Sequence, residues 1–103
     1  MFVGAYRIDL HIPASRSLKA KRSVVNALKA RLAALDASVA EVGEQDLWQR
    51  CVLGVAAVSG DVHYLDDLAD RIRAVVEREP RVVLLSLDRR VAPPDFDTYE
   101  RGF

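Results

Sequence analysis

From residue 2 to residue 12, near the start of the chain, most alternate positions are apolar. This is the period of a β-strand that buries one face. Pro13 lacks the backbone N–H that a sheet ladder needs, so it ends the predicted strand. The inward positions are Phe2, Tyr6, Ile8, Leu10 and Ile12.

Two later segments carry the three- and four-residue apolar spacing of amphipathic helices. Ser17 is a suitable N-cap for the first helix, and Ser59-Gly60-Asp61 both breaks the chain and caps the second. Pro80 marks the end of the second helix. The predicted inward positions are Leu18, Val25, Leu28, Leu32 and Leu35 in the first helix, and Leu65, Leu68, Ile72, Val75 and Val76 in the second.

Three further strands complete the pattern. Residues 39–42 and 48–59 flank a polar loop and predict a hairpin, and the run Val82-Val83-Leu84-Leu85 predicts a strand buried on both faces. The order strand, helix, strand, strand, helix, strand predicts an α+β fold, the ferredoxin-like split β-α-β-β-α-β sandwich. Right-handed crossovers place both helices on one face of an antiparallel sheet, with the first and third strands central. Residues 1–90 form this single domain, and residues 91–103 form a C-terminal extension.

The third strand is apolar on both parities, which predicts that its second face is covered as well. Small residues there would let another sheet approach closely, so we expect a homodimer or another partner on this face. The alternative is that the aromatic segment 96–103 folds back over it. The predicted subunit-interface residues are Ala5, Val52, Gly54 and Ala56.

Composition bounds the class of protein. The 103 residues contain 15 Lys+Arg and 15 Asp+Glu, with 50% hydrophobic residues, so the chain is neither a disordered tail nor a polycation. Any contact with nucleic acid must come from a local patch. No apolar run approaches the roughly 20 residues that cross a bilayer. The lone Cys51 and the lack of a visible signal peptide predict a cytoplasmic protein and no membrane partner.

The first helix carries the sharpest charge feature. Six cations and no acid lie between Ala14 and Leu35, whereas acids and bases of the second helix are spaced for Asp67–Arg71 or Arg73–Glu77 pairs. A basic stripe of this kind suits the phosphates of RNA. An ordinary solvated face, or contact with an acidic surface of another subunit, would give the same pattern. The cations are Arg16, Lys19, Lys21, Arg22, Lys29 and Arg31, and the predicted solvent-facing stripe is Lys19, Arg22, Asn26 and Lys29.

Trp48, with Arg50 nearby, is a second candidate for RNA or partner binding. An indole can stack on an unpaired base, while Gln45 and Asp46 read the edge of that base. A single tryptophan at a strand start is alternatively a partly buried anchor. The centre of the third strand, Cys51 to Val55, holds no aromatic residue, which disfavours the stacking arrangement of a standard RRM.

Signatures of catalysis are missing from the sequence. His11 and His63 lie on different predicted elements, and there is no Gly-rich phosphate loop, CxxC pair or HExxH motif. Arg16 near a helix N-terminus suits an anion, but the remaining features of an acylphosphatase are missing. Cys51 has no partner base and fits a small core residue. We therefore predict a non-enzymatic protein with no catalytic residues, metal or cofactor.

Two segments resemble a known family. Residues 12–22 (IPASRSLKAKR) and 38–50 (SVAEVGEQDLWQR) are similar to the YlxP-like family of small bacterial proteins of unknown function, a resemblance that spans roughly residues 1–90. The resemblance implies a ferredoxin-like fold, a cytoplasmic bacterial protein, and genes that often lie near those for translation initiation and ribosome-binding factors. It brings no catalytic residues.

The charge pattern and the resemblance together favour a non-enzymatic accessory protein of ribosome maturation or translation. Its expected partner is ribosomal RNA or a ribosomal protein, bound through Lys19, Arg22 and Lys29. The alternative is a dimeric regulatory module that binds a small polar or anionic ligand between subunits. That ligand site is predicted near Arg7, Asp9, Glu41 and Arg50.

Overall fold

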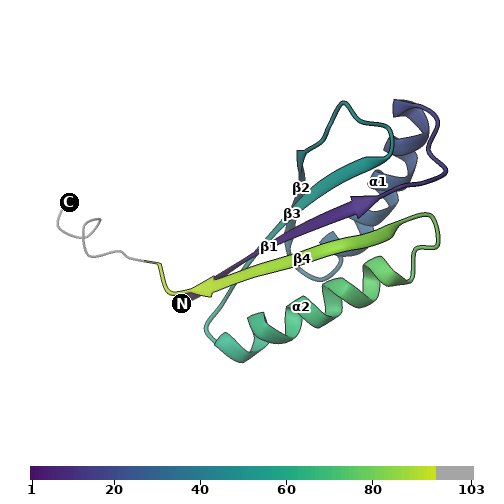
Figure 1. The fold of residues 1–103 in the computed structure, drawn as a ribbon. Helices are drawn as coiled ribbons and strands as arrows, with labels where there is room; N and C mark the ends of the chain where they lie inside the picture. The colour runs from purple at the N-terminus through teal and green to yellow at the C-terminus, as the bar shows by residue number, and fades with distance from the viewer. Residues whose placement is uncertain (95–103) are drawn as a thin grey trace, which may run out of the picture.

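The structure, a computed structural model, describes residues 1–94 and has the predicted order of elements (Figure 1). The α+β ferredoxin-like fold is confirmed. Its strands are β1 (Phe2–His11), β2 (Ser38–Gly43), β3 (Arg50–Ser59) and β4 (Val83–Ala92), and its helices are α1 (Leu18–Ala33) and α2 (Val62–Glu77).

The four strands form one antiparallel sheet in the order β2-β3-β1-β4. The prediction that β1 and β3 occupy the centre is confirmed. Phe2 lies opposite Ser59 at one end of this central pair, and His11 lies opposite Arg50 at the other. Both helices contribute to the core on one face, so no helix of residues 1–94 lies on the second face of the sheet.

Both predicted N-caps form. The Ser17 hydroxyl accepts a hydrogen bond from the Ala20 amide at 3.0 Å, and the Asp61 carboxylate accepts one from the His63 amide at 2.9 Å. Each cap satisfies an amide that the first helical turn leaves free. The prediction that Leu18 points inward is wrong, because this first-turn side chain is 39% exposed.

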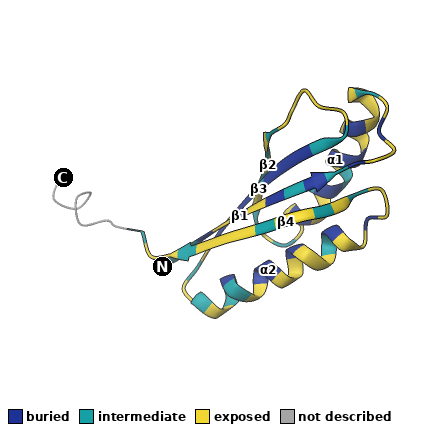
Figure 2. Ribbon diagram, viewed as in Figure 1, coloured by how far each residue is buried: buried dark blue, intermediate teal, exposed yellow. Residues whose placement is uncertain are grey.

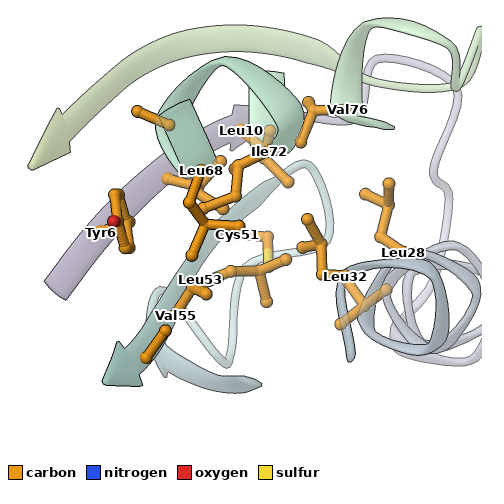
Figure 3. Packing of buried hydrophobic residues seen from close by; sticks show 14 of the residues in the cluster. Tyr6, Leu10, Leu28, Leu32, Cys51, Leu53, Val55, Leu68, Ile72 and Val76 are labelled. Atoms are coloured by element: carbon orange, nitrogen blue, oxygen red, sulfur yellow. The ribbon is translucent and has the colours of Figure 1, made fainter. Parts of the chain in front are cut away.

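The core lies between the sheet and the two helices. Figure 3 shows Leu53 and Val55 of β3 beside Leu68 of α2, and Leu32 of α1 close to Cys51. The buried Tyr6 hydroxyl donates to the backbone carbonyl of Leu65 and so ties β1 to α2. Desolvation raises the pKa of the Cys51 thiol to about 12, so this residue is a neutral core side chain, as predicted from the sequence.

The edge strand β4 differs from the prediction. Leu84, Leu87 and Val91 face the core, but Val83 and Leu85 are each about half exposed, so β4 is not buried on both faces. The reason is its place at the sheet edge, with a register irregularity where it meets Asp9 and Leu10. β4 also continues to Ala92, which lies opposite Val3. The aromatic segment 96–103 lies outside the described residues.

Glu79, just after α2, links the two helices. Its buried carboxylate accepts hydrogen bonds from the Arg81 side chain at 2.8 and 2.9 Å and from the Arg81 amide at 3.0 Å. Arg31 of α1 donates to the same carboxylate at 3.3 Å. The hydrogen bonds from Arg81 lower the pKa of Glu79 to about 2.

We expect Glu79→Gln to lower the free energy of unfolding at pH 7 by about 1–3 kcal/mol, because charge-assisted hydrogen bonds are lost. The folded-state pKa is depressed, so this stabilisation is complete above the unfolded pKa of about 4.3. It disappears as the pH falls toward about 2. Urea unfolding at pH 7 and pH 3 should therefore show a smaller difference between wild type and variant at pH 3. Glu77→Gln, on the exposed side of α2, is the control, and an equal Glu79→Gln effect at both pH values would contradict the assignment.

Candidate functional site

The cations of α1 fall into two groups. Lys21 is buried, its Nζ lies 3.0 Å from Glu41 Oε2, and it donates to the Glu44 carbonyl at 2.6 Å and the Gln45 carbonyl at 3.3 Å. Arg31 pairs with Glu79. The expectation that the basic charges of this segment have no acidic partner is therefore wrong for Lys21 and Arg31. The acid that pairs with Lys21 is on β2, and the acid that pairs with Arg31 follows α2, so both lie far along the chain.

Of the remaining four cations of this segment, Lys19, Arg22 and Lys29 lie on the outer face of α1, and Arg16 lies just before its N-cap. Within residues 1–94, none of them forms an ion pair. Lys29 is partly buried and the other members are exposed, as is Asn26 on the same face. The predicted stripe is thus accessible, and its charges are available to a partner. We call Arg16, Lys19, Arg22, Asn26 and Lys29 the basic face.

Charges on α2 are arranged differently from the prediction. Neither Asp67–Arg71 nor Arg73–Glu77 is an ion pair among the described residues. The Arg71 guanidinium instead lies over the Tyr64 ring, 5.7 Å from its centroid. The sequence spacing permitted the helical pairs, but an aromatic neighbour provided Arg71 with another contact.

The loop between β2 and β3 is held against the connection from β1 to α1. The Gln49 side chain donates to the carbonyls of Pro13 at 3.1 Å and Ser15 at 3.2 Å. The Ile12 amide donates to the Gln49 carbonyl at 2.9 Å. Together with Lys21, these bonds place the two loops at the same end of the molecule (Figure 1).

Trp48 projects from this loop with 52% of its surface exposed, so it is not a buried anchor. Its neighbour Leu47 is also about half exposed. A shallow hollow of about 400 Å³ lies along residues 46–50. Because Gln49 binds the Ser15 carbonyl, this exposed indole lies beside the chain segment that carries Arg16 and enters α1. The structure thus brings Trp48 to the same end as the start of the basic face.

Arg50 belongs to a different environment. Its Nη2 lies 2.9 Å from Asp9 Oδ1, and the hydrogen bond with Asp9 raises the pKa of Arg50. This internal pair offsets part of the guanidinium charge. The contact of Arg50 with RNA or a partner beside Trp48 stays a prediction, and it would compete with Asp9.

The predicted ligand site near Arg7, Asp9, Glu41 and Arg50 is not assembled. Glu41 lies opposite Leu53, a core position of β3, and therefore points to the helix-covered face, where Lys21 pairs with it. The other three residues lie on the opposite face of the sheet. Parity along one strand did not reveal which side of the sheet Glu41 would occupy.

The helix-free side of the sheet, which we call the open face, has two neighbouring cross-strand rows at its centre. They line a hollow of about 780 Å³. The strand registers place Ala40, Gly54, Arg7 and Asp88 in one row, which we call the Arg7 row. They place Ser38, Ala56, Ala5 and Arg90 in the next, which we call the Ala5 row.

The predicted interface residues differ in how far the rest of the chain shields them from solvent. Val52 is buried within the chain, so this part of the open face is already covered. Val42 packs over Gly54, where a Cβ would lie 3.1 Å from its Cγ1. Ala5 and Ala56 remain exposed. Figure 2 shows exposed residues along most of β4 as well.

Residues 1–94 contain no group of three or more His, Cys, Asp or Glu side chains placed to hold a metal ion. His11 lies on β1 and His63 in the first turn of α2. In the same described part of the chain, every helix is too short or too polar to cross a bilayer.

Comparison with protein families gives a match over residues 3–89 to the family described as "Protein of unknown function (DUF503)". The chain belongs to the DUF503 family. This DUF503 protein is also 34% identical over 67 residues to the uncharacterized protein YlxP of Bacillus subtilis (strain 168), an alignment that covers 64% of the chain and 73% of YlxP. The resemblance to YlxP-like proteins is thereby confirmed.

Solved structures resemble the DUF503 chain in fold alone. The de novo designed protein Foldit4 superposes with a TM-score of 0.52 at 10% identity, covering 92% of the DUF503 chain and 100% of the design. The crystal structure of the VAO-type flavoprotein MtVAO713 from Myceliophthora thermophila C1 gives a TM-score of 0.53 at 15% identity. That match covers 97% of the DUF503 chain but only 20% of the flavoprotein.

Proposed function

We propose that this protein is a non-enzymatic accessory factor of ribosome maturation or translation that binds RNA through the basic face of α1. The observation that carries the proposal is a cluster of cations without acids. Those of the basic face form no ion pair within residues 1–94, and no acid lies between Ala14 and Leu35. The cations of α2 that form no ion pair, Arg71 and Arg73, instead share their helix with four acids. The paired cations are Lys21, Arg31, Arg50, Arg81 and Arg89.

Cations that lack an internal partner are suited to phosphate binding, because no existing ion pair has to be broken. Lys19 and Lys29 are ten residues apart on one helix, a rise of about 15 Å. A stripe of that length can follow several phosphates along a strand. The gene neighbourhood implied by the YlxP resemblance supports ribosomal RNA as the partner.

Trp48 adds a second type of contact at the same end. A half-exposed indole offers a planar surface on which an unpaired base can stack. The bonds from Gln49 and Lys21 hold the loop in place, so little ordering is needed when RNA binds. The combination of phosphate contacts and one stacking surface favours an RNA segment with unpaired bases.

The regulatory-module alternative has less support. Glu41 lies on the other side of the sheet from Arg7, and Asp9 and Arg50 already form an ion pair with each other. A ligand site there would have to be built from Arg7 with fewer polar partners than predicted.

The triple variant Lys19→Glu, Arg22→Glu, Lys29→Glu should lose co-sedimentation with ribosomal particles at low salt, because attraction to phosphate becomes repulsion. If three phosphates are contacted, wild-type affinity should fall about 20- to 40-fold between 50 and 200 mM salt. The matched control reverses the same number of charges on the α2 segment: Arg71→Glu, Arg73→Glu, Arg78→Glu. If the α1 triple variant co-sediments with ribosomal particles as well as the α2 control variant does, the proposal loses its basis.

A further inference from the structure

The two central rows of the open face differ in a complementary way. On β1, the Arg7 row has the large Arg7 where the Ala5 row has the small Ala5. On β4, the Arg7 row has the acidic Asp88 where the Ala5 row has the basic Arg90. On β2 and β3 the corresponding positions are all small, Ala40 with Ser38 and Gly54 with Ala56. On β1 a large side chain in one row thus matches a small one in the other row, and on β4 an acid matches a base.

We propose that the open face binds a second copy of this chain about a two-fold axis that runs across the strands between these two rows. Such an axis lays the Arg7 row of each copy over the Ala5 row of the other. Asp88 of each copy then meets Arg90 of the other, so the ion pair forms twice. Arg7 extends over the small Ala5 of the second copy.

The charges are available for this arrangement. Arg7 lies directly opposite Asp88 in the β1–β4 register, yet neither of them, nor Arg90, forms an ion pair within residues 1–94. All three are exposed. A second copy supplies the opposite charge at the position where the chain itself leaves it unpaired.

The size and character of the face also fit a second copy. At about 4.8 Å between strands and about 3.3 Å per residue, three strands with nine paired residues and the six residues of β2 give roughly 500 Å² of flat area, before side-chain relief is counted. A standard interface buries about 800 Å² per partner. The small central side chains permit the spacing of about 10 Å between packed sheets. Val42 and Val58, both more than half exposed, would lose contact with water.

This inference is independent of the proposed RNA binding. Face-to-face sheets leave both helices of each copy on the outer sides of the pair, because the helices cover the other face. The basic face of α1 stays accessible in the dimer. Failure of either proposal therefore leaves the other standing.

Sedimentation equilibrium of the full chain should give twice its 11.4 kDa mass at about 50 μM. Asp88→Arg and Arg90→Asp each place like charges together, and each should weaken the dimer at least tenfold. The double exchange Asp88→Arg/Arg90→Asp restores opposite charges across the axis and should recover most of the affinity. Asp67→Arg, on the solvent side of α2, is the control for a charge change away from the interface.

Ala56→Arg provides a second variant, since it adds bulk at an exposed position without reversing a charge. It should also dissociate the dimer while far-UV circular dichroism stays unchanged. A wild-type protein that remains monomeric would overturn the proposal. This holds whether the open face is then covered by residues 95–103 or by a different protein. The proposed axis would be overturned if the single charge-reversal variants dimerised as tightly as the wild type. It would also be overturned if the double variant formed a weaker dimer than either single variant.

Discussion

Replacing Lys21 with alanine should lower the free energy of unfolding by about 3 kcal/mol, the low end for breaking a buried ion pair. The change removes the cation that pairs with Glu41 and the donor for the carbonyls of Glu44 and Gln45. These acceptors stay partly enclosed and cannot all reach water without movement of the loop. Urea unfolding at pH 7 measures the loss.

The same substitution should loosen the loop that carries Trp48. The Leu47 amide donates to the Glu44 carbonyl at 3.2 Å, so its hydrogen exchange should accelerate in the Lys21 variant. Lys19→Ala is the matched control, because that side chain lies two residues earlier on the exposed side of the same helix. Its expected effect is below about 0.5 kcal/mol. Equal losses for the two variants would mean that Lys21 is not the link between α1 and the loop.

Leu53→Ala should cost about 3–5 kcal/mol, the range for emptying a fully enclosed leucine site. Leu53 is 0% exposed at the centre of β3 and contributes to the core between both helices (Figure 3). Neighbours anchored on the sheet and on two helices cannot all move in to fill the space. Thermal and urea unfolding should both report the loss.

Leu18→Ala makes the same chemical change on α1, where the side chain is 39% exposed. It should cost less than about 1 kcal/mol, because little packing is lost and alanine favours helix. A Leu53→Ala loss as small as that of Leu18→Ala would show that the core relaxes around the missing side chain.

The elements of the fold were predictable because their signals are local. The alternating residues of β1, the helical spacing of α2 and the caps Ser17 and Asp61 each depend on a few neighbouring positions. The exposure of β4 was not predictable in this way, because it depends on how much of each face the rest of the molecule covers at the edge of the sheet. A continuous apolar run does not reveal that coverage.

Lys21 illustrates the limit for charges. A count of charges along the helix placed it among six cations without an acidic partner, because its acid lies 20 residues away on β2. One local signal was present: Lys21 precedes Val25 by four residues and Leu28 by seven, the spacing of a shared helix face. The exposed members of the basic face followed from the same period. The exposure of Trp48 did not, because the loop position depends on bonds from Gln49 and Lys21.

The position of Trp48 separates two optical signals in this chain. It is the sole tryptophan, and half of its surface meets water in the folded state. Its emission therefore resembles that of an unfolded chain and responds weakly to loss of the core. A base that stacks on the indole would quench it directly. Intrinsic fluorescence thus follows the loop and its ligand, while circular dichroism follows the fold.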